Sequence, residues 1–285
     1  MATAQPSHWK SRLFVGLQYF LPQHLLTRLV RWFMSRETVW LKNLQIRTFC
    51  RLFHIRVDEA AQQVPDGYAS LNAFFTRTLR DDARPTDDAP LTAPCDGVIS
   101  ECGRIDNGRI VQAKGFRYSA AELLQDAALA DRYEGGSFMT IYLAPYDYHR
   151  VHFPVTAHVT REWHIPGQLF SVNGATASAV PRLFARNERR TFTLETGATT
   201  LSLVMVGALN VGSISTVWER EALAAGSVSE PTDLALPVTS FGQGDTLGWF
   251  NMGSTVILLL PADAGTWRDD LEAGDVVRCG EALIR

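Results

Sequence analysis

The sequence predicts an α+β protein in which N-terminal amphipathic helices precede a β-rich body, barrel- or sandwich-like, that contains a few further helices. Apolar residues recur at helical spacing between residues 9 and 55. Beyond residue 90 the period changes to short apolar runs separated by Gly, Asn and Asp, which is typical of strands joined by turns. The chain of 285 residues is long enough to bury a large core.

Three helical segments are expected at the N-terminus, over residues 9–21, 25–33 and 37–54. Pro22 would end or kink the first, and Ser35 would cap the third. Basic residues interrupt these segments too often to leave the ~20 apolar residues that a transmembrane helix needs. There is also no apolar core followed by a small-residue cleavage site, so no signal peptide is expected.

Charge is distributed unevenly along the chain. Residues 1–57 carry nine basic residues and one acid, a balance of +8, so the remaining residues must carry −11 to give the net charge of −3. A basic helical arm rich in Trp, Phe, Leu and Arg suits the interface of an anionic membrane. The alternative is that its apolar stripes pack on the protein's own core. Nucleic acid is disfavoured, because the arm is apolar and has no recognisable reading motif.

The rest of the chain divides into a helix and linker, residues 58–90, and a β-rich catalytic domain, residues 91–285. A short helix is expected over 70–80, capped by Ser70, and two more over 120–129 and 175–184. The expected strands cover residues 97–99, 108–111, 138–143, 201–206, 211–217 and 256–260.

Metal binding is not expected. The four cysteines form no CxxC pair, and no third ligand stands at a suitable spacing from the pair of histidines described below. The cysteines indicate a reducing compartment.

Gly253 and Ser254 stand between an aromatic pair and an apolar strand. The Gly253 carbonyl has no neighbouring Cβ to shield it, so the Ser254 hydroxyl is a possible nucleophile against its own preceding peptide bond. The alternative is a simple strand-entry turn, in which glycine bends the chain and serine bonds the backbone.

His149 and His152 lie between two prolines in a segment crowded with ionisable groups, directly after an expected strand. Histidine exchanges protons near neutral pH, although a hydrogen-bonded structural pair is the alternative. Asp96 opens another strand in a Pro-Cys-Asp-Gly turn. It is a candidate to orient a histidine, which would complete a Ser254, His152 and Asp96 arrangement.

Two further segments look suited to an anionic ligand, residues 166–173 and 183–189. Their candidate substrate-binding residues are Phe170, Arg186, Asn187 and Arg189. Arginine forks bind phosphate or carboxylate, but Arg186 and Arg189 could equally form a solvated helix face.

Taken together, these motifs resemble a known family. Met252-Gly253-Ser254-Thr255, Tyr148–His152, Pro94–Ser100 and Phe184–Arg189 stand in the order found in the bacterial, membrane-associated (type I) pyruvoyl-dependent phosphatidylserine decarboxylases. Phe74-Phe75-Thr76-Arg77 is similar to a further family segment, and the resemblance covers nearly the whole chain. Met252 departs from the Leu usual in the family, a change of similar volume.

The resemblance implies a mechanism. Ser254 attacks the Gly253 carbonyl, with His152 as base and Asp96 orienting it, and the chain separates into a β chain (1–253) and an α chain (254–285). Ser254 becomes a covalent pyruvoyl group, the cofactor, which forms a Schiff base with phosphatidylserine and withdraws electrons so that CO2 can leave. His149 is the candidate that reprotonates the carbanion to give phosphatidylethanolamine.

The implied partners are phosphatidylserine in an anionic membrane, the protein's own second chain, and further copies in a homo-oligomer. The implied location is peripheral, at the cytoplasmic face of the cell membrane.

Two other classes remain as alternatives. A serine hydrolase would use the same Ser-His-Asp set without self-cleavage, but the chain has no Gly-x-Ser-x-Gly motif. Residues 271–284 resemble the closing hairpin of lipoyl or biotinyl carrier domains, although no carrier-type lysine hairpin is present.

Overall fold

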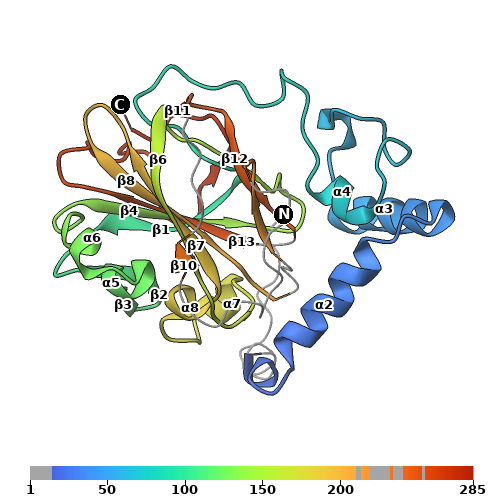
Figure 1. Ribbon diagram of the computed structural model, residues 1–285, viewed down its shortest axis with the longest axis horizontal. Coiled ribbons are helices and arrows are strands. Elements are labelled where there is room, and N and C mark those ends of the chain that lie inside the picture. The colour runs from blue at the N-terminus through green and yellow to red at the C-terminus, as the bar shows by residue number, and fades with distance from the viewer. Residues whose placement is uncertain (1–14, 210–212, 219–231, 234–239, 252–253, 285) are drawn as a thin grey trace.

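The computed structural model describes residues 15–209, 213–218, 232–233, 240–251 and 254–284 (Figure 1). Its main sheet has nine antiparallel strands, in the order β10-β6-β7-β8-β13-β4-β1-β14, with β11 also paired to β6. These strands are β1 (Gly97–Arg104), β4 (Ser137–Leu143), β6 (Ala157–Ile165), β7 (Arg189–Glu195), β8 (Thr200–Val206), β10 (Thr232–Asp233), β11 (Ser240–Phe241), β13 (Ser254–Leu260) and β14 (Val276–Val277).

Two smaller sheets complete the β structure. One has the order β5-β12-β9, formed by Arg150–His152, Thr246–Phe250 and Ile214–Thr216, and the other is the hairpin of β2 (Arg109–Ala113) and β3 (Phe116–Ser119). The predicted α+β class is confirmed. The barrel form of that prediction is wrong for the described residues, because β14 and β10 end the main sheet as separate edges.

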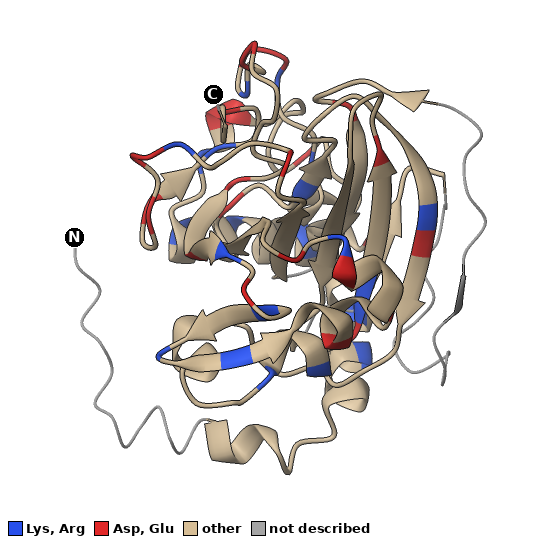
Figure 2. Cartoon of the chain, turned by 90° about the vertical axis from the view of Figure 1, so that its left-hand side faces the viewer, with Lys and Arg blue, Asp and Glu red and all other residues tan. Residues whose placement is uncertain are grey.

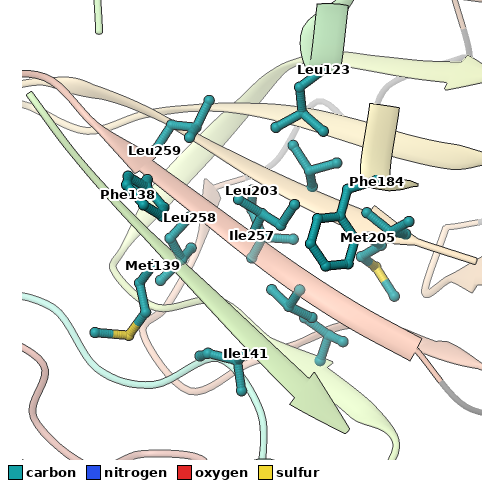
Figure 3. Packing of buried hydrophobic residues seen from close by; sticks show 14 of the residues in the cluster. Leu123, Phe138, Met139, Ile141, Phe184, Leu203, Met205, Ile257, Leu258 and Leu259 are labelled. Carbon is teal, nitrogen blue, oxygen red and sulfur yellow. The ribbon is translucent and has the colours of Figure 1, made fainter. Parts of the chain in front are cut away.

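The core is organised around β13, whose seven residues are all buried. It lies between β4 and β8, so both of its backbone edges are paired, with Val256 opposite Ile141 and Met205. Figure 3 shows Ile257, Leu258 and Leu259 among apolar side chains of β4 and β8, with Leu123 and Phe184 packed nearby. A strand buried on both faces is continuously apolar, which is why its sequence shows no alternation.

β6 and β7 are the longest of the strands that the sequence analysis missed. β6 does alternate, but it carries Arg161 and Glu162, and β7 begins with the buried pair Arg189 and Arg190. Arg190 forms an ion pair with Glu162 across the two strands, with Nη1 2.8 Å from Oε1. Elsewhere the strands are largely uncharged, and most charged residues lie in loops and at strand ends (Figure 2).

The predicted helices of the body are shorter than expected. The 120–129 segment forms α5 (Ala120–Leu124) and α6 (Ala127–Asp131), because Gln125 is left-handed and Asp126 caps a new helix. The 175–184 segment forms α7 (Gly174–Ala177) and α8 (Leu183–Arg186), which flank Pro181.

The N-terminal helices lie to one side of the sheet (Figure 1). They are α2 (Gln23–Met34), α3 (Val39–Phe53), the 3-10 turn η1 (Val57–Glu59) and α4 (Leu71–Phe75), and residues 15–18 are also helical. Ser70 caps α4 as predicted, through a bond from the Ala73 N–H. Ser35 does not cap α3; it ends α2, and Thr38 precedes α3.

These helices have their own small core, and they join the body through side chains. The cluster contains Met34, Ile46, Ile55, Ala60, Tyr68, Leu71 and Phe74. Gln18 and Gln23 accept hydrogen bonds from the Ser171 and Leu169 backbone N–H groups. Among the described residues, no helix is long and apolar enough to span a membrane.

Candidate active site

Ser254 is the first residue of β13 and lies opposite Leu143, the last residue of β4. Its side chain is fully buried, and Oγ has no hydrogen-bond partner. A strand-entry turn would use the serine hydroxyl to bond the backbone, so the structure gives that interpretation no support. A buried hydroxyl without a partner is instead available for chemistry. Gly253 lies outside the described residues.

Asn251 holds the chain in place just before the cleavage site proposed from the sequence. Its Nδ2 donates to the Oγ atoms of Ser213 and Ser215, at 2.7 and 3.2 Å, and Oδ1 accepts from Asn72 Nδ2 at 3.3 Å. Its backbone N–H also donates to the Ser213 carbonyl. The sequence analysis gave Asn251 no role, because a single asparagine next to an aromatic pair has no distinguishing pattern.

His152 lies on β5 with both ring nitrogens in hydrogen bonds. Nδ1 is 2.7 Å from the Gly244 carbonyl oxygen and therefore carries the proton, because a carbonyl can only accept. Nε2 then accepts from the Tyr148 hydroxyl at 3.0 Å. Burial is the largest influence and lowers the pKa of His152 below its ordinary value. The imidazole is therefore neutral near pH 7, with its lone pair on Nε2, as a general base requires.

Asp96 is almost buried at the start of β1, where its carboxylate binds Arg84 and the Cys279 backbone N–H. The hydrogen bonds that orient His152 come from Gly244 and Tyr148, not from Asp96. Asp96 nevertheless lies close enough for its negative charge to raise the pKa of His152 against the larger effect of burial. The His152 N–H also donates to the Pro94 carbonyl, which keeps the two segments adjacent.

His149 is fully buried beside the end of β12, where the Phe250 N–H donates to its carbonyl. Its Nδ1 donates to the Asp147 carbonyl at 2.9 Å, so Nε2 holds the lone pair, and Nε2 has no partner. Burial, with a further effect of the nearby Arg77 charge, lowers the pKa of His149 to about 3. The imidazole is therefore neutral near pH 7, and the lone pair of Nε2 is not used in a hydrogen bond.

Asp147 is an additional ionisable group that the sequence analysis left without a role. Its Oδ2 accepts from the Ala144 N–H at 2.7 Å. Burial raises the pKa of Asp147 to about 6, and the negative charge of Asp96 adds to the shift. A carboxyl whose pKa lies near neutrality is common in active sites. The signal was its place in the Tyr-Asp-Tyr-His run, but the run alone did not distinguish Asp147 from its neighbours.

A cavity of about 530 Å³ adjoins these groups. The body contributes Asp96, Asp147 and Tyr148 to its lining, and the end of α3 contributes Leu52 and Phe53. Arginine residues line it too, at positions 56, 77 and 84. The helical arm thus meets Asp96 and its neighbours at one cavity, whose lining combines three arginines, the acids Glu59, Asp96 and Asp147, and apolar side chains of α3. Ser254, His149 and His152 are not among its lining residues.

The four candidate substrate-binding residues lie elsewhere and differ in what they can do. Asn187 donates to the Phe170 and Gly207 carbonyls and accepts from the Phe170 N–H, and Arg189 donates to four backbone carbonyls. Both are buried, and Arg189 lies on a strand rather than a solvated helix face. The side-chain N–H groups of Asn187 and Arg189 are thus already used in hydrogen bonds to the backbone. The structure therefore does not support these two residues as lipid contacts.

Phe170 and Arg186 face the N-terminal segment. The Arg186 guanidinium lies 5.2 Å from the Phe170 ring centroid, and Phe170 lines a second cavity of about 400 Å³ with Tyr19 and Gln23. This cavity shares no lining residue with the cavity beside Asp96. Among the described residues, no group of three or more His, Cys, Asp or Glu side chains is placed to hold a metal ion.

The described residues thus combine a buried serine hydroxyl without a partner, at the head of the central strand of an open antiparallel sheet, with two histidines that are neutral near pH 7. These are groups with which an enzyme performs nucleophilic and acid–base chemistry. The comparisons identify which enzyme family this is. The family model for phosphatidylserine decarboxylase matches residues 71–285, so the chain belongs to that family, as the sequence motifs predicted. A second model, named PSD, matches residues 13–54.

Curated relatives resemble the chain over nearly its full length. The phosphatidylserine decarboxylase proenzyme of Saccharophagus degradans is 41% identical and covers 96% of this chain and 97% of its own. The proenzyme of Azotobacter vinelandii is 42% identical, covering 96% and 98%. That of Shewanella baltica is 45% identical, covering 94% and 95%. The protein is therefore a decarboxylase of this family.

Proposed function

We propose that the chain decarboxylates phosphatidylserine to phosphatidylethanolamine, after cutting itself between Gly253 and Ser254 to form a pyruvoyl group from Ser254. The observation that carries the proposal is the fully buried Ser254 Oγ without a partner, at the head of the central strand of a phosphatidylserine decarboxylase family member. A pyruvoyl group at this position fits the site, because it has no hydroxyl and so would not leave a buried O–H without a hydrogen-bond partner.

Self-cleavage uses groups that the chain itself supplies. His152 Nε2 takes the Ser254 hydroxyl proton, and Oγ attacks the Gly253 carbonyl carbon. The Gly253–Ser254 amide becomes an ester on Ser254 Oγ. Loss of the Ser254 Cα proton then breaks the Cβ–Oγ bond, which leaves a carboxylate on Gly253. Hydrolysis by water releases ammonia from the new N-terminus of the 254–285 chain and leaves the pyruvoyl ketone there.

Asp96 assists as a charge rather than through a direct bond. When His152 takes the proton it becomes an imidazolium, and the nearby Asp96 carboxylate stabilises that cation. Arg84 holds the Asp96 carboxylate in one orientation. Asp96 is therefore proposed as the electrostatic partner of His152, with Gly244 and Tyr148 setting the direction of the ring.

When formed, the pyruvoyl group supplies a carbonyl that can withdraw electrons from the substrate carbon that loses CO2. His149 is proposed to move the proton. Without substrate, burial and the Arg77 charge lower the pKa of His149 to about 3, so Nε2 can take the proton of the headgroup ammonium only once the negative charge of the bound substrate lies nearby. The imidazolium can then return that proton to the carbon after CO2 leaves.

The helical arm supports a membrane substrate, because large apolar side chains cover its outer face as well as the face that packs in its small core. On α2 and α3, Leu29, Trp32, Trp40 and Leu44 are more than half exposed, whereas Thr27 and Lys42 are buried. A stable water-facing helix has the opposite arrangement. An apolar outer face with arginines between suits the interface of an anionic bilayer. We infer a peripheral enzyme at the cytoplasmic face of the cell membrane, assembled from its two chains and further copies.

The experiment that tests the function is release of labelled CO2 from carboxyl-labelled phosphatidylserine in anionic vesicles, with wild-type protein and Ser254→Ala. Wild-type protein should release CO2 and form phosphatidylethanolamine in equal amounts, and the variant should release none. Release of serine or fatty acid without CO2 would instead indicate a hydrolase and contradict the proposal.

A further inference from the structure

Arg77 follows α4 and lies in the protein interior with its charge almost unmatched. The residue is 5% exposed, and its guanidinium lies 4.9 Å from the Phe74 ring centroid. Its Nε is buried without a hydrogen-bond partner, and Nη1 makes only a long 3.5 Å bond to the Phe74 carbonyl. Across the part of the chain that the structure describes, no carboxylate forms an ion pair with Arg77.

Other buried or partly buried arginines of the protein have carboxylate partners or several carbonyl acceptors, which Arg77 lacks. Arg84 binds Asp96 and Glu59, Arg190 binds Glu162, and Arg189 donates to four carbonyls. Burial of a charge is costly unless the charge is paired, and a guanidinium stays protonated at any physiological pH. The missing counter-charge of Arg77 therefore points to an anion that comes from outside the chain.

The space for that anion is the cavity of about 530 Å³, whose lining includes Arg77, Tyr148 and the end of α3. A second unpartnered atom lies close by. The ring of Phe75, two residues before Arg77, lies 4.0 Å from the ring of His149, and His149 Nε2 is buried without a partner. Arg77 lines the cavity, and its charge lies close enough to His149 to lower the pKa of that histidine.

We propose that Arg77 is the binding residue for the phosphodiester of the phospholipid substrate, in the cavity between the end of α3 and Tyr148. The proposal rests on the proposed function and specifies which substrate group is held at this point. The lipid would reach the cavity from the arm, whose apolar outer face adjoins it through the exposed Leu52.

The phosphodiester fits Arg77 better than the serine carboxylate does. Decarboxylation removes the negative charge of the carboxylate in the transition state, so a guanidinium bound there would stabilise the substrate more than the transition state. The phosphodiester keeps its charge throughout, and a fork of guanidinium donors matches its oxygens. The positive charge of Arg77 lowers the pKa of His149. A bound phosphodiester would offset that charge and so help His149 to hold a proton.

The test compares two substrates that differ in the phosphate alone. Hexadecyl phosphoserine and O-hexadecyl-L-serine share the amine, the carboxylate and the chain, and both are presented in neutral detergent micelles. The proteins are wild type, Arg77→Met, Arg77→Lys and the control Arg80→Met, which removes an exposed arginine paired with Asp82. Self-cleavage is followed on denaturing gels, and kcat/KM is measured by CO2 release.

We expect Arg77→Met to cleave itself and to lose at least ~30-fold in kcat/KM on the phosphoserine lipid, while staying within about threefold of wild type on the alkylserine. Arg77→Lys should lie between, because lysine keeps the charge without the fork. The Arg80→Met control should match wild type on both substrates. An equal loss on both substrates, or no loss on either, would overturn the proposal; the equal loss would indicate a carboxylate contact or a structural role.

If Arg77→Met fails to fold, Arg77→Lys decides by the same ratio of the two substrates. A readout independent of activity separates this proposal from the proposed function. Calorimetric titration of Ser254→Ala with glycerol 3-phosphate should show binding that Arg77→Met abolishes in the same background. Binding unchanged by Arg77→Met would overturn the anion site even if the enzyme decarboxylates phosphatidylserine. Wild-type protein inactive on both lipids, with that binding intact, would count against the proposed function alone.

Discussion

Arg84 binds the carboxylate of Asp96 with two of its nitrogens, Nε at 2.8 Å from Oδ1 and Nη2 at 2.5 Å from Oδ2. The same Nη2 lies 3.0 Å from Glu59 Oε2, and Glu59 also pairs with Arg56 at the end of the helical arm. The charge proposed to assist His152 is therefore tied to the segment that connects the arm to the body. Arg84, which is distant from His152 in the sequence, thus fixes the position of the Asp96 carboxylate.

Replacing Arg84 tests this link. Arg84→Met would leave the Asp96 carboxylate nearly buried without its main partner, which favours displacement of the side chain. We expect self-cleavage to slow by about 10- to 100-fold, measured by the appearance of the small chain on gels. The control Arg80→Met should cleave at the wild-type rate, and unchanged cleavage in Arg84→Met would show that Asp96 needs no such partner.

Asn251 should matter for self-cleavage more than for stability. Its four side-chain hydrogen bonds hold the chain next to the proposed cleavage site, and Asn251→Ala removes them all. Since small misplacement of reacting atoms is costly, cleavage should slow by about tenfold or more. Asn72→Ala removes a single 3.3 Å bond to Asn251 and serves as the mild comparison. Equal effects of the two substitutions would argue against a positioning role.

Asp147 makes stability depend on pH in a predictable direction. Its folded pKa of about 6 is raised from 3.8, so its stabilising contribution is complete below pH 3.8 and is lost as pH rises through 6. Asp147→Asn removes that loss and can still accept from the Ala144 N–H. In the Ser254→Ala background, urea unfolding should therefore favour the variant by about 1–3 kcal/mol more at pH 7 than at pH 4. A difference independent of pH would contradict the raised pKa.

The outer face of the arm should determine membrane binding. Leu29→Ser with Trp40→Ser removes two large exposed apolar side chains and should weaken binding to anionic vesicles by about 10- to 100-fold in a sedimentation assay. Self-cleavage should be unaffected, since neither residue forms the hydrogen bonds that hold Asp96, His152 or Asn251. Val217→Ser with Val276→Ser alters two exposed residues of the body and should bind as wild type does. Equal binding by both double variants would contradict the assignment of this face.

Sequence periodicity predicted the helices and strands in which apolar residues repeat with a clear local pattern. β4, β8 and β13 are short apolar runs because each is buried on both faces, and α2 and α3 show helical spacing. The same pattern could not tell which face of the arm is covered. Trp40 is exposed and Lys42 is buried, with its Nζ donating to the Pro65 carbonyl, so the covered face depends on packing against residues that follow the arm.

The partners of polar residues could not be predicted, because they come from distant segments. Asp96 was found from its turn, yet its partners Arg84 and Cys279 lie 12 and 183 residues away. From the sequence, Arg189 was a candidate to bind phosphate. In the fold its guanidinium instead donates to backbone carbonyls, among them those of Leu123 and Ala185. Arg77 is the reverse case. Its sequence context indicated no ligand, whereas the structure buries its Nε without a hydrogen-bond partner.

The central claim is that Ser254 cuts the chain before it and becomes the pyruvoyl group. Intact-mass analysis of purified protein beside Ser254→Ala tests it most directly. We predict that wild-type protein separates into chains 1–253 and 254–285, with a small chain that has no free amino group and a mass matching a pyruvoyl terminus, and that Ser254→Ala stays whole. An active wild-type protein that remains a single intact chain would contradict the account.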